Sequence, residues 1–321
     1  MNKDYTISFI RLLAMFLIIT CHLFQYYDNG LYKVFNIGVQ IFLVISGYLY
    51  GAKKREPVLP FIGKQFRKIL VPYWVFLTFA TLMYLAFFPE FLSTTIVVDS
   101  FLTIGTIRGI GHLWFIKYIL LCYCLVPLLG IIRDRMKSAG KMFVAALLAM
   151  TVIEFALRPF YLIDGVHLNC FILGYCLKCV EKPESRRTMN VMHTGIILLA
   201  IIANAMKLMI MYGYLTIDSG NSVRFIMEYA HLLFGASIFI LLHRFLAIKN
   251  ENAVLRFSDK YSYHIYLVHQ FFILSPFAIM TLTGLNILNY VLVYACSCLG
   301  GVLLFQACNL ILPGRKHKAG A

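Results

Sequence analysis

Apolar runs long enough to cross a lipid bilayer recur along the whole chain, and this feature limits the possible fold more than any other. Of the 321 residues, 61% are hydrophobic and only 13% are charged, whereas soluble proteins carry about 25% charged residues. A helix needs about 20 mostly apolar residues to span the hydrocarbon core. Backbone polar groups inside a bilayer must bond to one another, so such runs form helices. The sequence therefore predicts an all-α, polytopic integral membrane helical bundle.

We predict about ten membrane-spanning helices, several of them with aromatic residues at their ends. Their expected ranges are 7–27, 34–51, 69–88, 113–132, 142–157, 164–180, 191–212, 223–243, 261–281 and 286–312. The long outer segment 89–112 is apolar enough to be re-entrant or interfacial. No attached soluble domain is expected, so residues 1–321 are predicted to form one transmembrane domain.

The basic residues predict the orientation of the helices. With the N-terminus inside, 22 of the 29 Lys and Arg residues lie in inner segments and three lie in outer ones. Cytoplasmic loops carry such an excess, so both termini are expected in the cytoplasm. The net charge of +15 is therefore a topology signal, and a nucleic-acid partner is not expected.

The nine cysteines do not indicate a disulfide framework or a metal site. Most of them fall inside apolar runs or at the ends of these runs. Cys176 and Cys179 form a C-x-x-C pair, but a zinc site would need further ligands nearby. No metal and no permanently bound cofactor are expected.

The stretch RLLAMFLIITCH, residues 11–22, places an arginine and a histidine in the first apolar run. Eleven residues at 100° each bring His22 to within about 20° of Arg11, about 16 Å farther along the helix. Gln25 lies about 40° to the other side of Arg11, so the polar stripe continues outward. Arg11 could be a snorkelling anchor at the inner interface, and His22 could bond to a neighbouring helix. Ionisable groups at membrane depth more often mark a functional site.

Five motifs in order resemble the integral-membrane acyltransferase family 3. ISFIRLLAMFLIITCH resembles the Arg, ten residues, His spacing of the family's first helix, and GVQIFLVISGYLYG resembles its next helix, with Leu43 in place of a Phe. KQFRKILVPYW, GHLWFIKYILLCY and YSYHIYLVHQ are similar to three further segments. The resemblance covers about residues 5–310, which is nearly the whole chain.

The resemblance implies an enzyme that transfers an acyl group, most often acetyl. In this family the donor is typically a cytoplasmic acyl-coenzyme A. The acceptor is usually a hydroxyl group of a cell-surface sugar or lipid-linked saccharide. We therefore expect an O-acyltransferase of a cell membrane, with the bacterial cytoplasmic membrane as its place. Its expected partners are the lipid bilayer, acyl-coenzyme A and a saccharide acceptor, and its oligomeric state stays open.

Acyl transfer to a hydroxyl group needs a base and a group that stabilises the oxyanion. A neutral imidazole suits the base, so His22 is the expected catalytic residue, either as a base or as a covalent carrier of the acyl group. Arg11 suits an anionic part of the donor, because its guanidinium binds phosphate bidentately. The basic inner loops could steer the donor phosphates or serve topology alone.

The remaining candidate binding residues carry weaker signals. They are Gln25, Lys64, Arg67, Lys68, His112, Trp114, Arg224, Glu228, His231 and His269. Glu228 and His231 lie within about 40° of Arg224 on a helix, which allows either an Arg224–Glu228 ion pair or a wall of the acceptor path. His264 and His269 would lie about 140° apart, and the resemblance favours His269. Ser46 and Gly47 indicate a point of close helix packing.

A transporter or flippase for an envelope precursor is the main alternative, because ionisable residues at membrane depth also occur there. The sequence lacks the paired interrupted helices of an inverted repeat. The ordered motifs therefore favour the enzyme, with a structural role as a third possibility.

Overall fold

The computed structural model describes residues 3–136, 138–157, 164–181, 186–217 and 220–311. Within these residues every regular element is helical, which confirms the predicted all-α class. The chain forms two compact units. The first unit comprises Met1–Asn36, Leu59–Leu120 and Ile248–Ala321, and the second comprises Ile37–Val58 and Leu121–Ala247. The predicted basic tail beyond 311 and the outer Arg158 lie outside the described residues.

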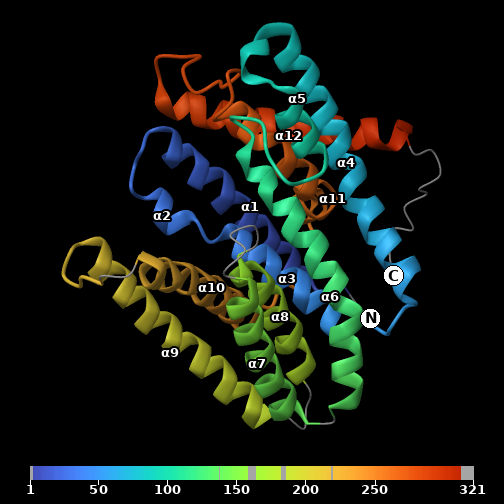
Figure 1. The fold of residues 1–321 in the computed structure, drawn as a ribbon, viewed down its shortest axis with the longest axis vertical. Helices are drawn as coiled ribbons and strands as arrows, with labels where there is room; N and C mark the ends of the chain where they lie inside the picture. Colours follow the sequence, from blue (N-terminus) through green and yellow to red (C-terminus); the bar gives the residue numbers. More distant parts are fainter. Residues whose placement is uncertain (1–2, 137, 158–163, 182–185, 218–219, 312–321) are drawn as a thin grey trace. The chain divides into compact units, whose positions relative to one another are not determined.

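The first unit is assembled from the two ends of the chain and one early segment (Figure 1). Side-chain caps begin three of its helices, since Asp4, Ser93 and Asn252 each accept a hydrogen bond from a backbone N–H of the first turn. Its elements are α1 (Tyr5–Tyr26), α2 (Tyr32–Phe35), α4 (Val58–Phe87), η1 (Pro89–Phe91), α5 (Thr94–Phe101), η2 (Gly111–Trp114), α11 (Ala253–Val268), η5 (His269–Phe272) and α12 (Asn286–Ile311). Helix α11 packs against both α1 and α12.

The second unit is a helical bundle built from the middle of the chain. It holds α3 (Gly38–Gly51), α7 (Ala139–Leu157), α8 (Gly165–Val180), α9 (Arg186–Met211) and α10 (Gly220–Phe245). Helix α6 (Phe115–Arg135) begins in the first unit and continues in the second. The pairs α7 with α8 and α9 with α10 run side by side (Figure 1).

Seven helices among the described residues are long and apolar enough to cross a membrane, which supports a polytopic bundle. These are Tyr5–Tyr26, Tyr32–Gly51, Val58–Phe87, Gly111–Arg135, Arg186–Met211, Gly220–Phe245 and Asn286–Ile311. Two further predicted spans, 142–157 and 164–180, correspond to the shorter apolar stretches Val144–Glu154 and Gly165–Val180.

The predicted span 261–281 is wrong as a continuous helix. Helix α11 begins earlier, at Ala253, and ends at Val268. A 3₁₀ turn follows at His269–Phe272, and no further helix is formed before Asn286. Pro276 lies in this stretch, and a proline removes a backbone donor and disfavours helix in the residue before it. The break is important because it places His269 at a corner of the chain.

The long helix α4 corrects the placement of the basic residues before residue 69. Lys64, Arg67 and Lys68 were expected in a loop, but α4 begins at Val58 and carries all three on its exposed surface. A charged stretch cannot lie in hydrocarbon, yet it can continue a helix beyond the membrane. The hydrophobic pattern therefore predicted where the apolar part of α4 begins, but it did not predict where the helix itself begins.

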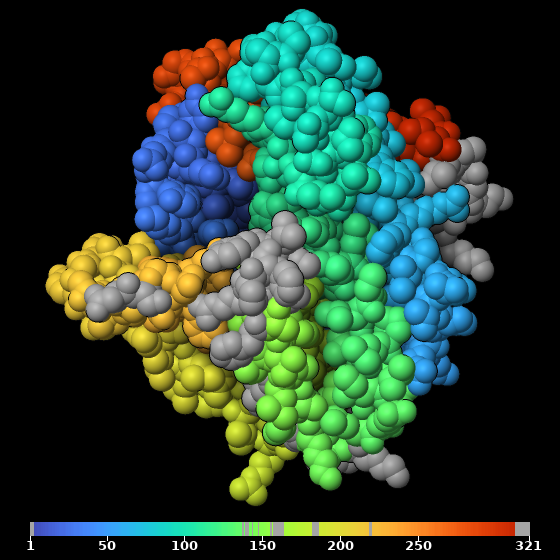
Figure 2. All heavy atoms as spheres, in the orientation of Figure 1, coloured from blue at the N-terminus to red at the C-terminus, as the bar shows by residue number. Residues whose placement is uncertain are grey.

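The segment after α4 folds back along that helix, and its predicted re-entrant or interfacial character stays a prediction. Tyr73, in the middle of α4, donates a hydrogen bond to the carbonyl oxygen of Ser100. Trp74 Nε1 donates to the carbonyl oxygen of Phe101 at 3.1 Å, and the Tyr84 hydroxyl donates to that of Arg108 at 2.6 Å. In Figure 2 the end of α4, η1 and α5 form one continuous cyan surface. These three hydrogen bonds hold the segment against α4 on its way to η2.

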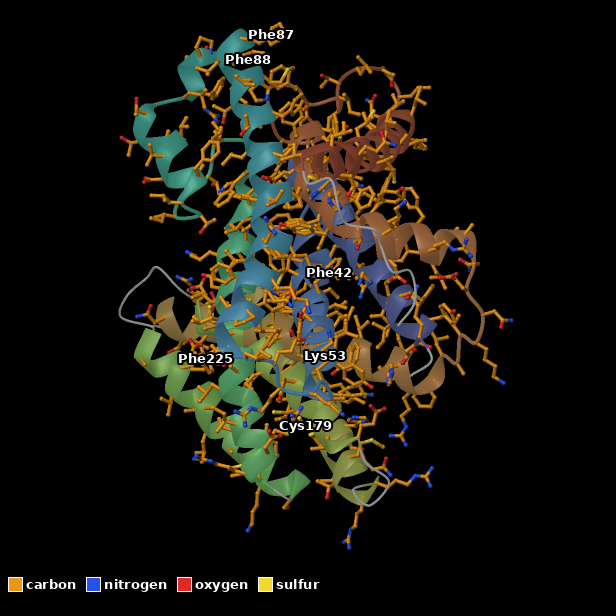
Figure 3. The ribbon with its side chains drawn as sticks, turned by 90° about the vertical axis from the view of Figure 1, so that its right-hand side faces the viewer. Phe42, Lys53, Phe87, Phe88, Cys179 and Phe225 are labelled. Atoms are coloured by element: carbon orange, nitrogen blue, oxygen red, sulfur yellow. The ribbon has the colours of Figure 1, made fainter. Side chains whose placement is uncertain are left out.

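Helices α3 and α8 approach each other at glycines in the second unit. A Cβ atom on Gly47 would lie 1.9 Å from the carbonyl oxygen of Phe171, and one on Gly174 would lie 2.0 Å from that of Val44. The predicted close-packing point at Gly47 is thus confirmed. At the end of the pair, the thiol of Cys179 lies 3.4 Å from the carbonyl oxygen of Gly51, and Figure 3 shows Cys179 at the same end as Lys53.

Candidate active site

Three histidines from distant parts of the sequence meet in the first unit. His22 lies near the end of α1, His112 lies in η2, and His269 begins η5. The ring centroids of His112 and His269 are 4.6 Å apart, and the His22 centroid lies 5.2 Å from that of His269 and 6.3 Å from that of His112. We call these residues the histidine cluster. The structure thereby brings together three residues singled out from the sequence.

His269 owes its position to the end of α11. Its Nδ1 lies 2.6 Å from the carbonyl oxygen of Tyr266, and a carbonyl can only accept, so Nδ1 carries the proton. Its Nε2 is buried and has no hydrogen-bond partner in the described part of the chain. The ring of His264 instead packs edge-on against Phe305, 5.2 Å away. Of the two histidines, His269 lies in the histidine cluster, and its role in the chemistry stays a prediction.

A tight turn before η2 brings His112 into the histidine cluster, and hydrogen bonds that involve backbone atoms fix its position. Gly109 in this turn has a φ of 86°, and a Cβ atom there would lie 2.5 Å from the Cα atom of Ser275, so the position requires glycine. The hydroxyl of Tyr266 donates to the carbonyl oxygen of His112 at 2.5 Å, and His112 Nε2 lies 3.1 Å from the carbonyl oxygen of Leu267. The residue is 3% exposed.

His22 is the partly exposed member of the histidine cluster. Its Nδ1 lies 2.8 Å from Oε1 of Gln25, three residues farther along α1. The tautomer decides which of the two ring nitrogens carries the lone pair that can act as a base. Gln25 was predicted on the polar stripe of this helix, and the structure adds that it orients the imidazole of His22.

Arg11 forms an ion pair that the sequence analysis did not predict. Its Nη1 lies 2.6 Å from Oδ1 of Asp259 on α11. The second carboxylate oxygen of Asp259 accepts from the hydroxyl of Ser8 at 2.6 Å and lies 2.8 Å from Nζ of Lys3. A guanidinium has five N–H donors, so this contact orients Arg11 and uses one of its nitrogens.

The same ion-pair network continues to Glu251 before α11. Lys3 Nζ lies 3.0 Å from Oε1 of Glu251. The hydrogen bond to Asp259 raises the pKa of Lys3, and the hydrogen bond from Lys3 lowers the pKa of Glu251. Both shifts favour the charged forms of Lys3 and Glu251. The ion pairs tie the start of α1 to the start of α11, at the end of the helix where Arg11 lies.

Other predicted binding residues of the first unit lie at its surface. The Trp114 side chain is 37% exposed and packs edge-on against Tyr118, with ring centroids 5.4 Å apart. The basic residues of α4, Lys64, Arg67 and Lys68, are exposed. Their contribution to donor binding stays a prediction.

Arg224, Glu228 and His231 belong to the second unit and have partners there. Nε of Arg224 lies 2.7 Å from Oε1 of Glu228, which confirms the predicted ion pair. Arg224 also pairs with Asp164. His231 Nε2 lies 2.8 Å from Nζ of Lys207, a buried residue. These contacts describe a polar network inside the second unit, and a role in acceptor binding stays a prediction.

The sequence did not predict three residues that hold the predicted site residues in position. They are Gln270, Asp259 and Tyr266. Gln270 Nε2 lies 3.2 Å from Nδ1 of His22, 248 positions earlier in the chain. Periodicity within one helix cannot reveal a contact of this separation. Two signals pointed toward them: Gln270 follows His269 directly, and Asp259 is an acidic residue within a basic segment.

A family model described as an acyltransferase domain matches residues 4–308. No curated protein and no solved structure matches the chain. The family match spans the whole histidine cluster as well as Arg11 and Asp259. On this evidence, the chain belongs to the acyltransferase family 3, and it is a membrane acyltransferase.

Proposed function

We propose that the protein moves an acyl group, most simply acetyl, from cytoplasmic acyl-coenzyme A to a hydroxyl group of a cell-surface or lipid-linked saccharide. The observation that carries this proposal is the histidine cluster, in which the ring centroid of His22 lies 5.2 Å from that of His269 and 6.3 Å from that of His112. The contact of 2.8 Å between His22 Nδ1 and Oε1 of Gln25 orients the imidazole of His22. Such an arrangement fits proton transfer during attack on a thioester.

The transfer step can be written from His22 alone. The unprotonated ring nitrogen of His22 takes the proton of the acceptor hydroxyl as the hydroxyl oxygen attacks the thioester carbonyl carbon. The tetrahedral intermediate collapses, the C–S bond breaks, and the imidazolium returns the proton to the leaving thiolate. The products are an ester and free coenzyme A. In the alternative route, the unprotonated ring nitrogen of His22 attacks the thioester carbonyl carbon, the C–S bond breaks, and the thiolate of coenzyme A leaves. The acceptor hydroxyl then attacks the acyl-imidazole, the N–acyl bond breaks, and the hydroxyl proton passes to the thiolate, which gives the ester and free coenzyme A.

Arg11 is the proposed contact for an anionic group of the donor. It lies about 16 Å from His22 along α1, a distance that the extended pantetheine arm of acyl-coenzyme A can cover. Asp259 holds one nitrogen of the guanidinium at 2.6 Å. Both residues lie toward the predicted cytoplasmic end of α1, where the donor would enter.

Replacing Arg11 with lysine should weaken donor binding about tenfold, because the charge remains while the planar fork is lost. Acyl-coenzyme A binding to the purified variant would be measured by calorimetry or fluorescence. The matched control is Lys117→Arg on α6, a cation of the same unit outside the ion-pair network. Donor affinity equal to that of the unaltered protein would make Arg11 an interfacial anchor instead.

Membership in an acyltransferase family favours an enzyme over the transporter alternative. The activity itself is tested by mass spectrometry of envelope saccharides from cells with and without the protein. We expect acyl esters, seen as a mass increase of one acetyl group per modified sugar, only when the protein is present. An identical ester content in both samples would refute the proposed acceptor class.

A further inference from the structure

Gln270 lies between two members of the histidine cluster and is 4% exposed. Its Oε1 accepts the backbone N–H of His112 at 2.9 Å and lies 3.0 Å from Nδ1 of the same residue. Its Nε2 lies 3.2 Å from Nδ1 of His22 and 3.4 Å from Nε2 of His22. Gln270 directly follows His269 in η5. Its side-chain amide thus connects His112 in η2 to His22 in α1.

The backbone of His112 determines which way this amide points. A backbone N–H can only donate, so the oxygen of Gln270 must face His112. The two N–H donors of the amide must then face His22. A donor beside an imidazole stabilises the form that has a lone pair, since the imidazolium form has no acceptor nitrogen.

His112 meets acceptors at both ring nitrogens. Oε1 of Gln270 lies 3.0 Å from its Nδ1, and the carbonyl oxygen of Leu267 lies 3.1 Å from its Nε2. A neutral imidazole can donate from only one nitrogen, whereas the protonated form donates from both. Whichever ring nitrogen of His112 donates, its backbone N–H bonds to the oxygen of the Gln270 amide, so the N–H donors of this amide are left to face His22.

We propose that Gln270 is a positioning residue that keeps His22 in its basic form. This inference rests on the proposed function, because it assigns His22 the work of a base. The titratable groups that face His22 are His112 from η2 and His269 from η5, with Tyr266 of α11 behind them. The side chain of Gln270 lies between His22 and His112 and contacts both of them.

The decisive variant is Gln270→Glu, which replaces the N–H donors near His22 with a carboxylate. The carboxylate stabilises the imidazolium of His22, so transfer at pH 7 should fall at least about tenfold and recover as the pH rises. The rate of acyl transfer from labelled acetyl-coenzyme A to the envelope saccharide fraction is measured from pH 6 to pH 9. The expected result is a rising limb that is displaced by about one pH unit or more to higher pH.

Two matched variants keep the test decisive. Gln65→Glu places a carboxylate at another buried glutamine of the first unit, 5% exposed, and should leave the shape of the pH profile unchanged. Gln25→Glu places one at the exposed partner of His22 Nδ1 and should displace the profile without harming folding. If Gln270→Glu does not fold, Gln270→Asn is used, whose shorter amide cannot reach both histidines. It should lower kcat at least about tenfold with little change in KM for the donor.

The outcomes separate this inference from the proposed function. Absence of transfer by the unaltered protein would refute the proposed function. Transfer by the unaltered protein together with an unmoved profile for Gln270→Glu would refute the role of Gln270. An unchanged kcat for Gln270→Asn would refute it as well.

Discussion

Replacing His22 with alanine should reduce acyl transfer at least about 100-fold, because the proposed general base of the reaction is lost. The variant should still fold and insert. The side chain is partly exposed and bonds to Gln25 and Gln270 without taking part in an ion pair. Donor binding should stay largely intact, since Arg11 is unaltered. Initial rates in membranes, normalised to the amount of protein, give the comparison.

His264→Ala is the matched control for this prediction. It removes a histidine of the same unit that packs against Phe305 rather than against the histidine cluster. Its transfer rate should remain within a few-fold of that of the unaltered protein. Equal activities for His22→Ala and the unaltered protein would exclude His22 from the chemistry.

Replacing Gly174 with valine should strongly destabilise the second unit. The added Cβ atom would lie 2.0 Å from the carbonyl oxygen of Val44 and 2.8 Å from its carbonyl carbon. Backbone atoms cannot give way as a flexible side chain can, so α8 and α3 must separate. Overpacking of this kind costs about 1–3 kcal/mol or more. Thermal unfolding in detergent should show a clearly lower midpoint, together with a lower yield of folded protein.

Gly195→Val on α9 provides the control, because a Cβ atom there meets nothing within 4 Å. Valine changes helix propensity in both variants, so their difference isolates the α3–α8 contact. Equal unfolding midpoints for Gly174→Val and Gly195→Val would contradict the close approach of the two helices.

The sequence predicted the parts of the fold that depend on hydrophobicity and helical period. The apolar runs gave the class and most of the helices, and the 3.6-residue period placed Arg11, His22 and Gln25 on one side of α1. The same reasoning failed where a helix ends inside an apolar run. The predicted span 261–281 continued past Val268, although Pro276 signalled a break. It also failed where α4 extends beyond its apolar part through Lys64 and Lys68.

The sequence predicted which residues belong to the candidate site, but it did not predict the contacts that hold them together. The motif resemblance supplied His112 and His269, and the structure places their rings next to that of His22. The residues that orient them, Gln270 and Asp259, act across 248 positions of sequence. Such contacts depend on the tertiary packing of α1 against α11 and η5, and no local pattern encodes them.

In the proposed function, an acyl group passes from coenzyme A to a saccharide hydroxyl through the chemistry of His22. Purified protein in lipid vesicles, supplied with acyl-labelled acetyl-coenzyme A and the envelope saccharide fraction, tests it most directly. Labelled ester and free thiol are measured in the same reaction. We expect them to appear in equal amounts with the unaltered protein and to be absent with His22→Ala. Thiol release without labelled ester, or ester formation by His22→Ala at the unaltered rate, would contradict the account.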